Sequence, residues 1–370
     1  MESSTPSRLR RSLVAVATGA WAIAGGALFS WIGTPLPWLL GSLAAVSALS
    51  LSGRVSRLPA WGLTIGQISI GAALGLYFTP VVIHALGTLL GWMVFTGLAT
   101  CLLSMLGAVY LQRVTDLDGR SCFFAAAIGA ASDMAVQAAR DGARADLVAM
   151  SHTVRVALVV TIVPLLATFL AAHGQGSGSA QGTVEAVRLL PWLDMTWVCA
   201  CAAAAGYLGK RLRVPNPWIM GPLALTIAVA ALIPEARLQP SVVAGAQVLI
   251  GWALGQRFNR AMFRDSPRFL VGAASLTLLL LVAGAGLAWL VHWGANLPFA
   301  SAFIATAPGG IAEMAITAKV LALDPPTVTA FQAVRLVFIV LGVRLLLSLS
   351  LRLGWIREAA GAPPTHTSHP

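Results

Sequence analysis

Long apolar runs, separated by short polar or proline-containing stretches, recur along the whole chain. A helix needs about 20 apolar residues to cross the hydrocarbon core of a bilayer. Each half of the chain offers six segments that approach this length: 12–32, 36–51, 62–79, 84–111, 120–140 and 146–172, then 192–209, 216–233, 241–256, 268–293, 300–320 and 327–353. The pattern predicts an all-α polytopic membrane protein.

Charged residues are sparse. Hydrophobic types make up 58% of the 370 residues and charged types only 10%, whereas a soluble domain is about one quarter charged. So little charge cannot cover a water-facing surface, which excludes an ordinary soluble enzyme, a disordered regulator and a fibrous protein. Lys and Arg number 24 against 13 acidic residues, and in a membrane protein such an excess first sets the orientation of the loops.

The chain repeats itself at an offset of 180 residues with no insertion. Residues 36–46 align with 216–226, 66–75 with 246–255 and 127–138 with 307–318, with identities at 5 of 11, 6 of 10 and 5 of 12 positions. Such a constant offset indicates duplicated architecture rather than shared apolar composition. We expect a first membrane repeat (12–172), a flexible linker (173–190), a second membrane repeat (191–353) and a disordered C-terminal tail (354–370).

The distribution of basic residues indicates that the repeats are inverted. With a cytoplasmic N-terminus, two clusters fall on the cytoplasmic side only if the linker lies outside: Lys210, Arg211 and Arg213, then Arg257, Arg260, Arg264 and Arg268. This requires about five crossings per half, so that the segment 120–140 enters and leaves on one side. An odd number of crossings turns the second half upside down, as in many secondary transporters. We expect a multi-pass protein of a bacterial inner membrane with both termini cytoplasmic.

The segments 120–140 and 300–320 each contain a predicted helix break. Pro308, Gly309 and Gly310 are poor residues for a helix interior, and Gly129 is the matching glycine of the first half. Within a bilayer such a break is tolerated only where protein or a water-filled cavity satisfies the freed backbone groups. Each repeat should therefore contain one broken or re-entrant helical segment.

An acidic residue follows each break by the same distance. Asp133 lies four residues after Gly129, and Glu313 lies four residues after Gly309. Ionisable residues inside a membrane are by default functional, and a carboxylate beside free helix ends suits a coupling cation or a proton. The alternative is that each acid pairs with a basic residue or caps the broken helix.

Two arginines lie inside apolar runs, 22 residues after the two acids. The guanidinium groups of Arg155 and Arg335 match a carboxylate or a phosphate, which favours binding of an anionic substrate. The alternative is two structural ion pairs, Asp133–Arg155 and Glu313–Arg335. One helical turn before the arginines stand His152 and Gln332; His152 could shuttle a proton, but a buried neutral histidine is the favoured interpretation.

Gln67 and Gln247 lie in the glycine-spaced frames GQISIGAALG and AQVLIGWALG. Gly71/Gly75 and Gly251/Gly255 form GxxxG spacings that allow helices to approach closely. Packing is the favoured role of these frames, and the two glutamines remain candidate substrate ligands.

Familiar catalytic and metal-binding patterns are absent from the sequence. It contains no HxxE/HxxxH pair, GxSxG, P-loop or Rossmann fingerprint. The four cysteines form no CxxC, and the histidines outside the tail lie in different segments. We therefore expect no enzyme activity, no cofactor and no metal site.

The residues resemble a known family. The stretch APGGIAEMAITAKVLALDPPTVTAFQAVRLVFIV, the earlier LPWLLGSLAA and the duplication together are similar to the bacterial AbrB-duplication membrane proteins, over about residues 12–353. Members also carry the labels ammonia monooxygenase, transporter or regulator of gene expression. The first half departs from the family pattern, with Ile128 for proline, Ala130 for glycine, Asp133 for Glu and His152 for Gln. We accordingly favour the second half as the working site.

Together these features predict a secondary transporter that moves a small anionic solute with H⁺ or Na⁺. The expected partners are the solute, the coupling cation and the lipid bilayer, with no nucleic acid; a homo-oligomer is left open. One alternative is a membrane sensor that acts indirectly on gene expression. A monooxygenase is disfavoured because redox copper or iron needs clustered histidines and carboxylates.

Overall fold

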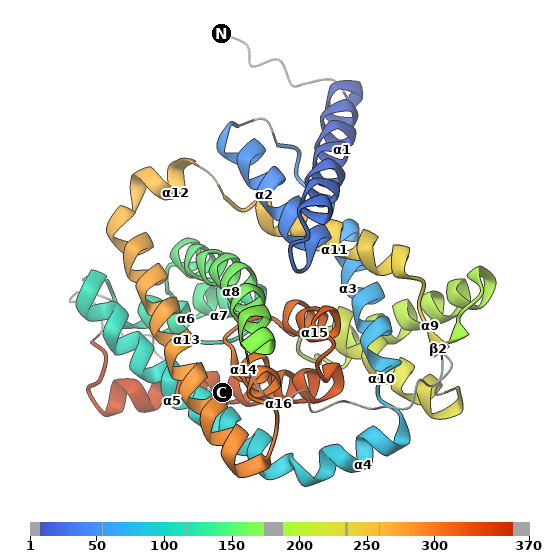
Figure 1. Cartoon of the computed structure of the whole chain (residues 1–370). Helices are drawn as coiled ribbons and strands as arrows, with labels where there is room; N and C mark the ends of the chain where they lie inside the picture. The colour runs from blue at the N-terminus through green and yellow to red at the C-terminus, as the bar shows by residue number, and fades with distance from the viewer. Residues whose placement is uncertain are drawn as a thin grey trace.

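The computed structural model describes residues 8–53, 55–115, 117–173, 188–233, 236–258 and 260–357 (Figure 1). The first half forms α1 (Arg8–Ile32), α2 (Pro37–Leu51), α3 (Ala60–Gly75), α4 (Pro80–Thr88), α5 (Leu90–Thr115), α6 (Gly119–Ala126), α7 (Ala131–Arg140) and α8 (Ala145–His173). The second half forms α9 (Trp192–Arg211), α10 (Pro217–Leu232), α11 (Pro240–Gly255), α12 (Arg260–Asp265), α13 (Pro267–Ala295), α14 (Phe299–Thr306), α15 (Ile311–Val320) and α16 (Pro325–Arg352).

Two short strands, β1 (Arg188–Leu189) and β2 (Ala236–Arg237), pair in parallel. The predicted linker 173–190 thus includes β1. Residues 174–187 of that linker and residues 358–370 of the predicted tail lie outside the described residues.

The helices recur at the offset found in the sequence. α3 and α11, α6 and α14, and α7 and α15 begin and end 180 residues apart, and α2 and α10 begin at matching prolines. The fold is therefore that of an all-α polytopic membrane protein built of two repeats, as predicted.

Several helices can span a bilayer. Among the described residues, α1, α5, α8, α13 and α16 are long and apolar enough to do so. α3 and α4 are together long and apolar enough for one further span but are bent by 85°, as in a broken span or a re-entrant loop, while α2, α10 and α11 are apolar but shorter. Large apolar side chains such as Trp31 and Leu341 are exposed on the outer faces, where lipid would cover them.

The prediction of one helix over 84–111 is wrong, because the structure divides it. α4 ends at Thr88, and the N–H of Leu89 donates to the carbonyl oxygen of Leu86 (3.0 Å) in a tighter turn. No residue of α4 is buried, so packing does not hold it in line with α5. The apolar pattern continues through this turn, so the sequence does not show where α4 ends and α5 begins.

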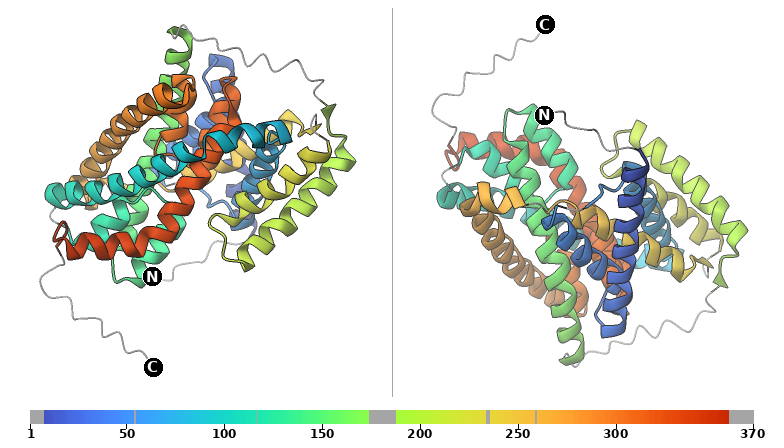
Figure 2. Two further views of the ribbon diagram at one scale, coloured as in Figure 1. Left: turned by 90° about the horizontal axis from the view of Figure 1, so that it is seen from below. Right: turned by 90° about the horizontal axis from the view of Figure 1, so that it is seen from above.

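The helices gather into two bundles, each built from both repeats (Figures 1 and 2). The first, called here the glycine bundle, contains α1, α2, α3, α9, α10 and α11. The second, the hairpin bundle, contains α5–α8 and α13–α16. The contacts between the bundles are fewer and include those of α15 and α16 with α3.

The two GxxxG spacings hold the glycine bundle together across the repeats. A Cβ on Gly71 of α3 would lie 2.6 Å from the carbonyl oxygen of Ile219 in α10, and a Cβ on Gly251 of α11 would lie 2.6 Å from that of Leu39 in α2. Only glycine permits such close backbone contact. The packing role predicted for these glycines is confirmed.

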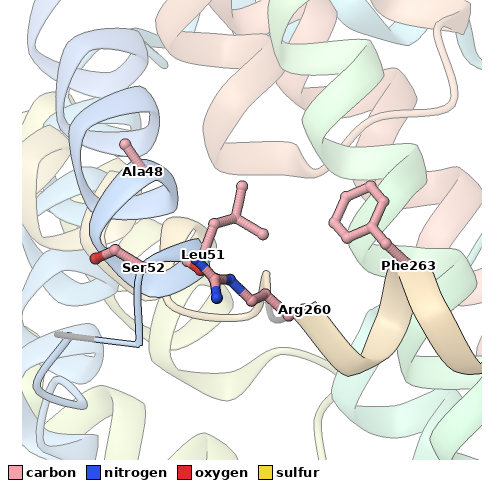
Figure 3. Close-up of a pocket in the computed structure, with 5 residues that line it drawn as sticks. All are labelled: Ala48, Leu51, Ser52, Arg260 and Phe263. Atoms are coloured by element: carbon pink, nitrogen blue, oxygen red, sulfur yellow. The ribbon is translucent and has the colours of Figure 1, made fainter.

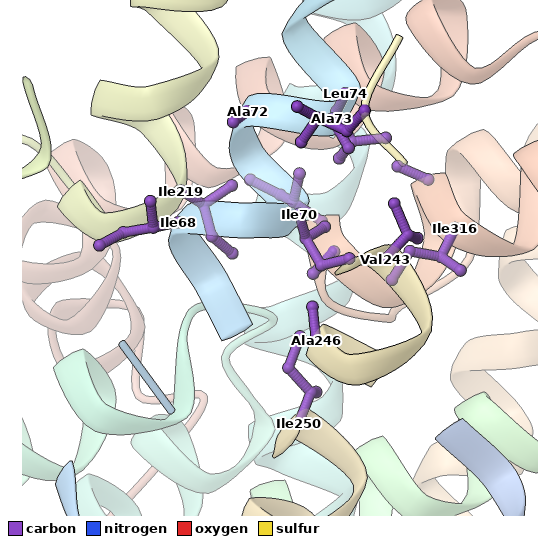
Figure 4. Packing of buried hydrophobic residues seen from close by; sticks show 14 of the residues in the cluster. Ile68, Ile70, Ala72, Ala73, Leu74, Ile219, Val243, Ala246, Ile250 and Ile316 are labelled. Atoms are coloured by element: carbon purple, nitrogen blue, oxygen red, sulfur yellow. The ribbon is translucent and has the colours of Figure 1, made fainter. Parts of the chain in front are cut away.

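Helix α15 of the hairpin bundle packs on the glycine bundle through apolar side chains (Figure 4). Its Ile316 lies beside Val243 of α11 and near Ile70 of α3 (Figure 4). The helix that carries Glu313 therefore lies at the interface between the bundles.

Candidate functional site

Each repeat contains a hairpin of two short helices joined by a break inside the hairpin bundle. In the first, residues 127–130 separate α6 from α7; in the second, residues 307–310 separate α14 from α15. The predicted break residues lie in these two connections: Gly129, Pro308, Gly309 and Gly310. Both hairpins are packed deep in the protein, since Phe123 and Phe303 beside the breaks are at most 1% exposed.

The second break is held by Gln332 and Arg335 of α16. Arg335 donates from Nη1 to the carbonyl oxygen of Ala307 (2.6 Å) and from Nη2 to that of Gly309 (2.6 Å). Gln332 Nε2 lies 3.0–3.1 Å from three carbonyl oxygens at the end of α14. A helix end leaves its last carbonyls without partners, and a buried unpaired group costs about 1–3 kcal/mol. These two side chains therefore stabilise the break.

The first break is held in the same way from α8. Arg155 donates from Nη1 to the carbonyl oxygen of Ala127 (2.9 Å), and its Nη2 lies 3.4 Å from that of Gly129. His152 Nε2 lies 3.0 Å from the carbonyl oxygen of Phe124, and its Nδ1 lies 2.6 Å from Arg155 Nη2. A carbonyl only accepts and a guanidinium only donates, so this arrangement requires a neutral imidazole with its proton on Nε2.

His152 and Gln332 thus do the same work in the two repeats. Each donates a hydrogen bond to the end of a short helix and accepts one from the arginine that follows on its own helix face: Arg155 for His152, and Arg335 for Gln332. This equivalence explains how a histidine and a glutamine can stand at matching positions.

The two predicted arginines are therefore committed largely to backbone carbonyls. Arg335 forms no ion pair with Glu313 in the part of the chain that the structure describes; its hydrogen bonds go to the break and to Gln332. Arg155 and Arg335 are 4% and 6% exposed, and each retains one buried Nε–H without a partner. The charge of Arg155 also acts on Arg335, so the two break-capping groups are electrostatic neighbours.

Asp133 and Glu313 occupy the third position of α7 and α15, in the first turn after each break. Free N–H groups and the positive end of the helix dipole favour a negative charge there. The Glu313 side chain folds back over Gly310, and its carboxyl group interacts with the backbone N–H of Glu313 itself. The acids thus lie at the breaks, as the sequence predicted.

The cation that acts on the charge of Glu313 is Arg257, which follows α11. Arg257 is half-buried, belongs to the end of the glycine bundle and also acts on His152. The sequence pattern does not distinguish Arg257 from the loop cations, because a cation after an apolar segment is typical of a cytoplasmic loop. Its one distinguishing signal is the 180-residue offset, which places it opposite Tyr77 rather than another cation.

The predicted glutamines differ in their surroundings. Gln247 is 6% exposed, and its Oε1 has no hydrogen-bond partner among the described residues. Gln67 of α3 is half-buried.

Four buried polar side-chain atoms are without a partner in the described part of the chain. Three of them belong to predicted site residues: Arg155 Nε, Arg335 Nε and Gln247 Oε1. The fourth is Ser47 Oγ. Buried groups of this kind are normally satisfied by water, an ion or a ligand.

A pocket of about 590 Å³ lies between α2 and α12 (Figure 3). Its lining includes Ala48, Leu51 and Arg260, and Arg260 Nε donates to the carbonyl oxygen of Leu51 (2.5 Å). The exposed cation in this lining, Arg260, stands three residues after Arg257. No group of three or more His, Cys, Asp or Glu side chains that could hold a metal occurs within the described ranges.

Comparison with known proteins identifies the family. The sequence profile described as transition state regulatory protein AbrB matches residues 2–91 and 38–350. The chain belongs to the AbrB family. The two overlapping matches are those expected of an internal duplication within the family's own sequence.

Two relatives cover most of the chain. "Uncharacterized protein YhjN" of Bacillus subtilis (strain 168) is 26% identical over 350 residues, which span 86% of this chain and 88% of the relative. "Putative regulator AbrB" of Escherichia coli (strain K12) is 25% identical over 312 residues, which span 83% of this chain and 88% of the relative. No solved structure matches the chain.

Proposed function

We propose that the protein is a secondary transporter that moves a small anionic solute together with H⁺ or Na⁺. The observation that carries this proposal is the pair of broken hairpins, one from each repeat, with an acid at each break and a buried arginine holding each break open. Secondary transporters of inverted-repeat architecture bind substrate and coupling ion at such discontinuous helices.

In this proposal Glu313 and Asp133 bind and release the coupling cation. An ionised carboxylate in an apolar setting is costly unless a cation or donors offset its charge. Glu313 has one remote cation, Arg257, and its own backbone N–H as partners. A proton or Na⁺ can therefore complete its surroundings and be released again on the other side of the membrane.

The arginines have two tasks in this proposal. Arg155 and Arg335 hold the breaks through Nη1 and Nη2, and each leaves its Nε–H for the solute. Gln247 adds a free carbonyl-type acceptor, Oε1, and Gln67 is a further candidate ligand. We place the protein in a bacterial inner membrane with both termini cytoplasmic, from the distribution of cations.

The test is uptake into proteoliposomes under an imposed proton or sodium gradient. Glu313→Gln should abolish the dependence of uptake on the gradient, Asp133→Asn should reduce it, and Asp194→Asn, which removes an exposed acid of α9, should leave it unchanged. Unchanged uptake and unchanged gradient dependence in Glu313→Gln would remove the coupling role.

The second candidate is a membrane sensor that binds its solute without net transport. It is favoured by the names of the family profile and of the Escherichia coli relative, which describe regulators. The discriminating measurement is counterflow: solute binding without exchange across the membrane supports the sensor, and exchange of labelled for unlabelled solute supports the transporter.

A further inference from the structure

Arg257 is held in place by the residues around it. On one side Gln256 Oε1 accepts from the N–H of Leu58 (2.5 Å), and on the other the carbonyl oxygen of Phe258 accepts from Ser50 Oγ. Arg260 then donates to the carbonyl oxygen of Leu51 (2.5 Å). The turn that carries Arg257 is thus fixed to α2 and to the start of α3, and its side chain begins from a pre-positioned backbone.

The guanidinium of Arg257 has no hydrogen-bond or ion-pair partner among the described residues, although the residue is half-buried. Its nitrogens are not among the fully buried side-chain atoms that lack a partner, so the group is accessible to a ligand. Arg335 and Arg155, by contrast, spend four of their donors on carbonyl oxygens of the breaks. Of these three arginines, Arg257 is therefore the one whose guanidinium N–H donors are not used by described residues.

Positive charge exceeds negative charge around this group. Arg257 acts on Glu313 and on His152, His152 is beside Arg155, and Arg155 acts on Arg335. With Asp133, which follows the first break, the set among the described residues holds three guanidinium groups and two carboxylates, and His152 is neutral. Even with Glu313 ionised, an anion is the species that reduces the imbalance.

We propose that Arg257 is the principal ligand of a small oxyanion, a carboxylate or a phosphate-type group, bound between the glycine bundle and the hairpin bundle opposite Glu313. A guanidinium offers paired N–H groups to two oxygens of such an anion. The proposal rests on the transporter function above and names the chemistry of its substrate. Because Arg257 and Glu313 belong to different bundles, an anion bound by Arg257 at their interface links solute occupancy to the relative position of the bundles.

The repeats differ at this point, which makes the site single. Arg257 stands 180 residues after Tyr77. Tyr77 is covered by two cations instead, with Arg237 Cζ 4.6 Å and Lys319 Nζ 5.6 Å from the centre of its ring. The first repeat has no guanidinium at the matching position, so we expect one oxyanion per chain rather than two.

The test is calorimetric titration of the full chain in lipid nanodiscs with acetate, succinate, phosphate and sulfate, each in turn. At least one should bind the unaltered protein, with one site per chain. Arg257→Gln should weaken that binding at least tenfold, and Arg257→Lys should weaken it less, because charge is kept and the fork is lost. Arg268→Gln, which removes an exposed cation of α13, should bind as the unaltered protein does.

Three results would overturn the proposal: none of the four anions binds, Arg257→Gln binds unchanged, or two equal sites are found. If Arg257→Gln fails to fold, modification of Arg257 by phenylglyoxal in the unaltered protein replaces it. The bound anion should slow that modification, mapped by mass spectrometry, and equal modification with and without anion contradicts the site.

The outcome is separable from that of the transporter proposal. Gradient-coupled uptake that needs Glu313 but is indifferent to Arg257 would reject the Arg257 site and keep the transporter. Anion binding that needs Arg257, without any flux or counterflow, would keep the site and reject transport.

Discussion

Arg335 Nη2 lies 2.6 Å from the carbonyl oxygen of Gly309, so a long helix directly holds the broken helix that it packs against. The same arginine also donates to the carbonyl oxygen of Ala307. The contact turns a segment that would be unstable in lipid into a fixed element, because the carbonyls freed by the break find a charged donor inside the protein.

Arg335→Gln should therefore destabilise the fold. The part-buried carbonyl of Gly309 loses its arginine donor, and the carbonyl of Ala307 keeps only Gln332 Nε2 and the N–H of Gly309. A buried polar group left unpaired costs about 1–3 kcal/mol. The measurement is the thermal unfolding midpoint in detergent, which should fall clearly below that of the unaltered protein, while Arg268→Gln should stay near it. An unchanged midpoint for Arg335→Gln would contradict the capping role.

His152→Gln should preserve stability and activity. Glutamine at the matching position 332 already joins short-helix carbonyls to an arginine through one donor and one acceptor. His152→Ala removes both and should lower the unfolding midpoint. If His152 instead shuttles a proton, His152→Gln will fold normally but lose its pH-dependent uptake, which separates the two interpretations.

Glu313 and Asp133 should contribute unequally to gradient coupling. The charge of Arg257 acts on Glu313, whereas the first repeat carries Tyr77 at the position that matches Arg257. Glu313→Gln should abolish gradient coupling, and Asp133→Asn should reduce it by a smaller factor. Initial uptake rates at several imposed gradients give the comparison; an Asp133→Asn effect as large as that of Glu313→Gln would argue for two working sites.

Replacement of two glycines of α11 by alanine should affect the unfolding midpoint differently. A Cβ on Gly251 would press on the backbone of α2, whereas a Cβ on Gly245 meets nothing within 4 Å. Overpacking costs about 1–3 kcal/mol, so Gly251→Ala should lower the unfolding midpoint. Gly245→Ala should leave it unchanged or raise it, because alanine is the better helix former by roughly 0.5–1 kcal/mol. Equal behaviour of both variants would contradict the close α2–α11 crossing.

The repeats and the breaks could be predicted from sequence because each leaves a local mark. Three consecutive residues that disfavour a helix interior predict the break at 308–310. A constant offset survives in the residue identities, as at Gly129 and Gly309. The GxxxG packing was predictable for the same reason, since a missing side chain decides how closely two backbones approach.

The sorting of helices into two bundles left no such mark. The long helices are apolar on most faces, so periodicity does not say which neighbours they meet. Arg257 was grouped with the loop cations for a related reason: a cation that ends an apolar run looks the same whether it faces cytosol or Glu313. Asn216 shows the limit at a helix start: asparagine is a favoured N-cap residue, and Asn216 precedes α10, but its side chain makes no capping hydrogen bond.

The inverted arrangement of the repeats is the claim on which the site and its function rest. The most direct measurement inserts the same epitope, in separate chains, after Gly142 and after Ala322, two loop positions 180 residues apart that are both exposed. Antibody should reach the tag after Ala322 from the outer side of the intact inner membrane, and the tag after Gly142 only once that membrane is opened. Detection of both tags from the same side would show that the two halves run parallel and would contradict the account.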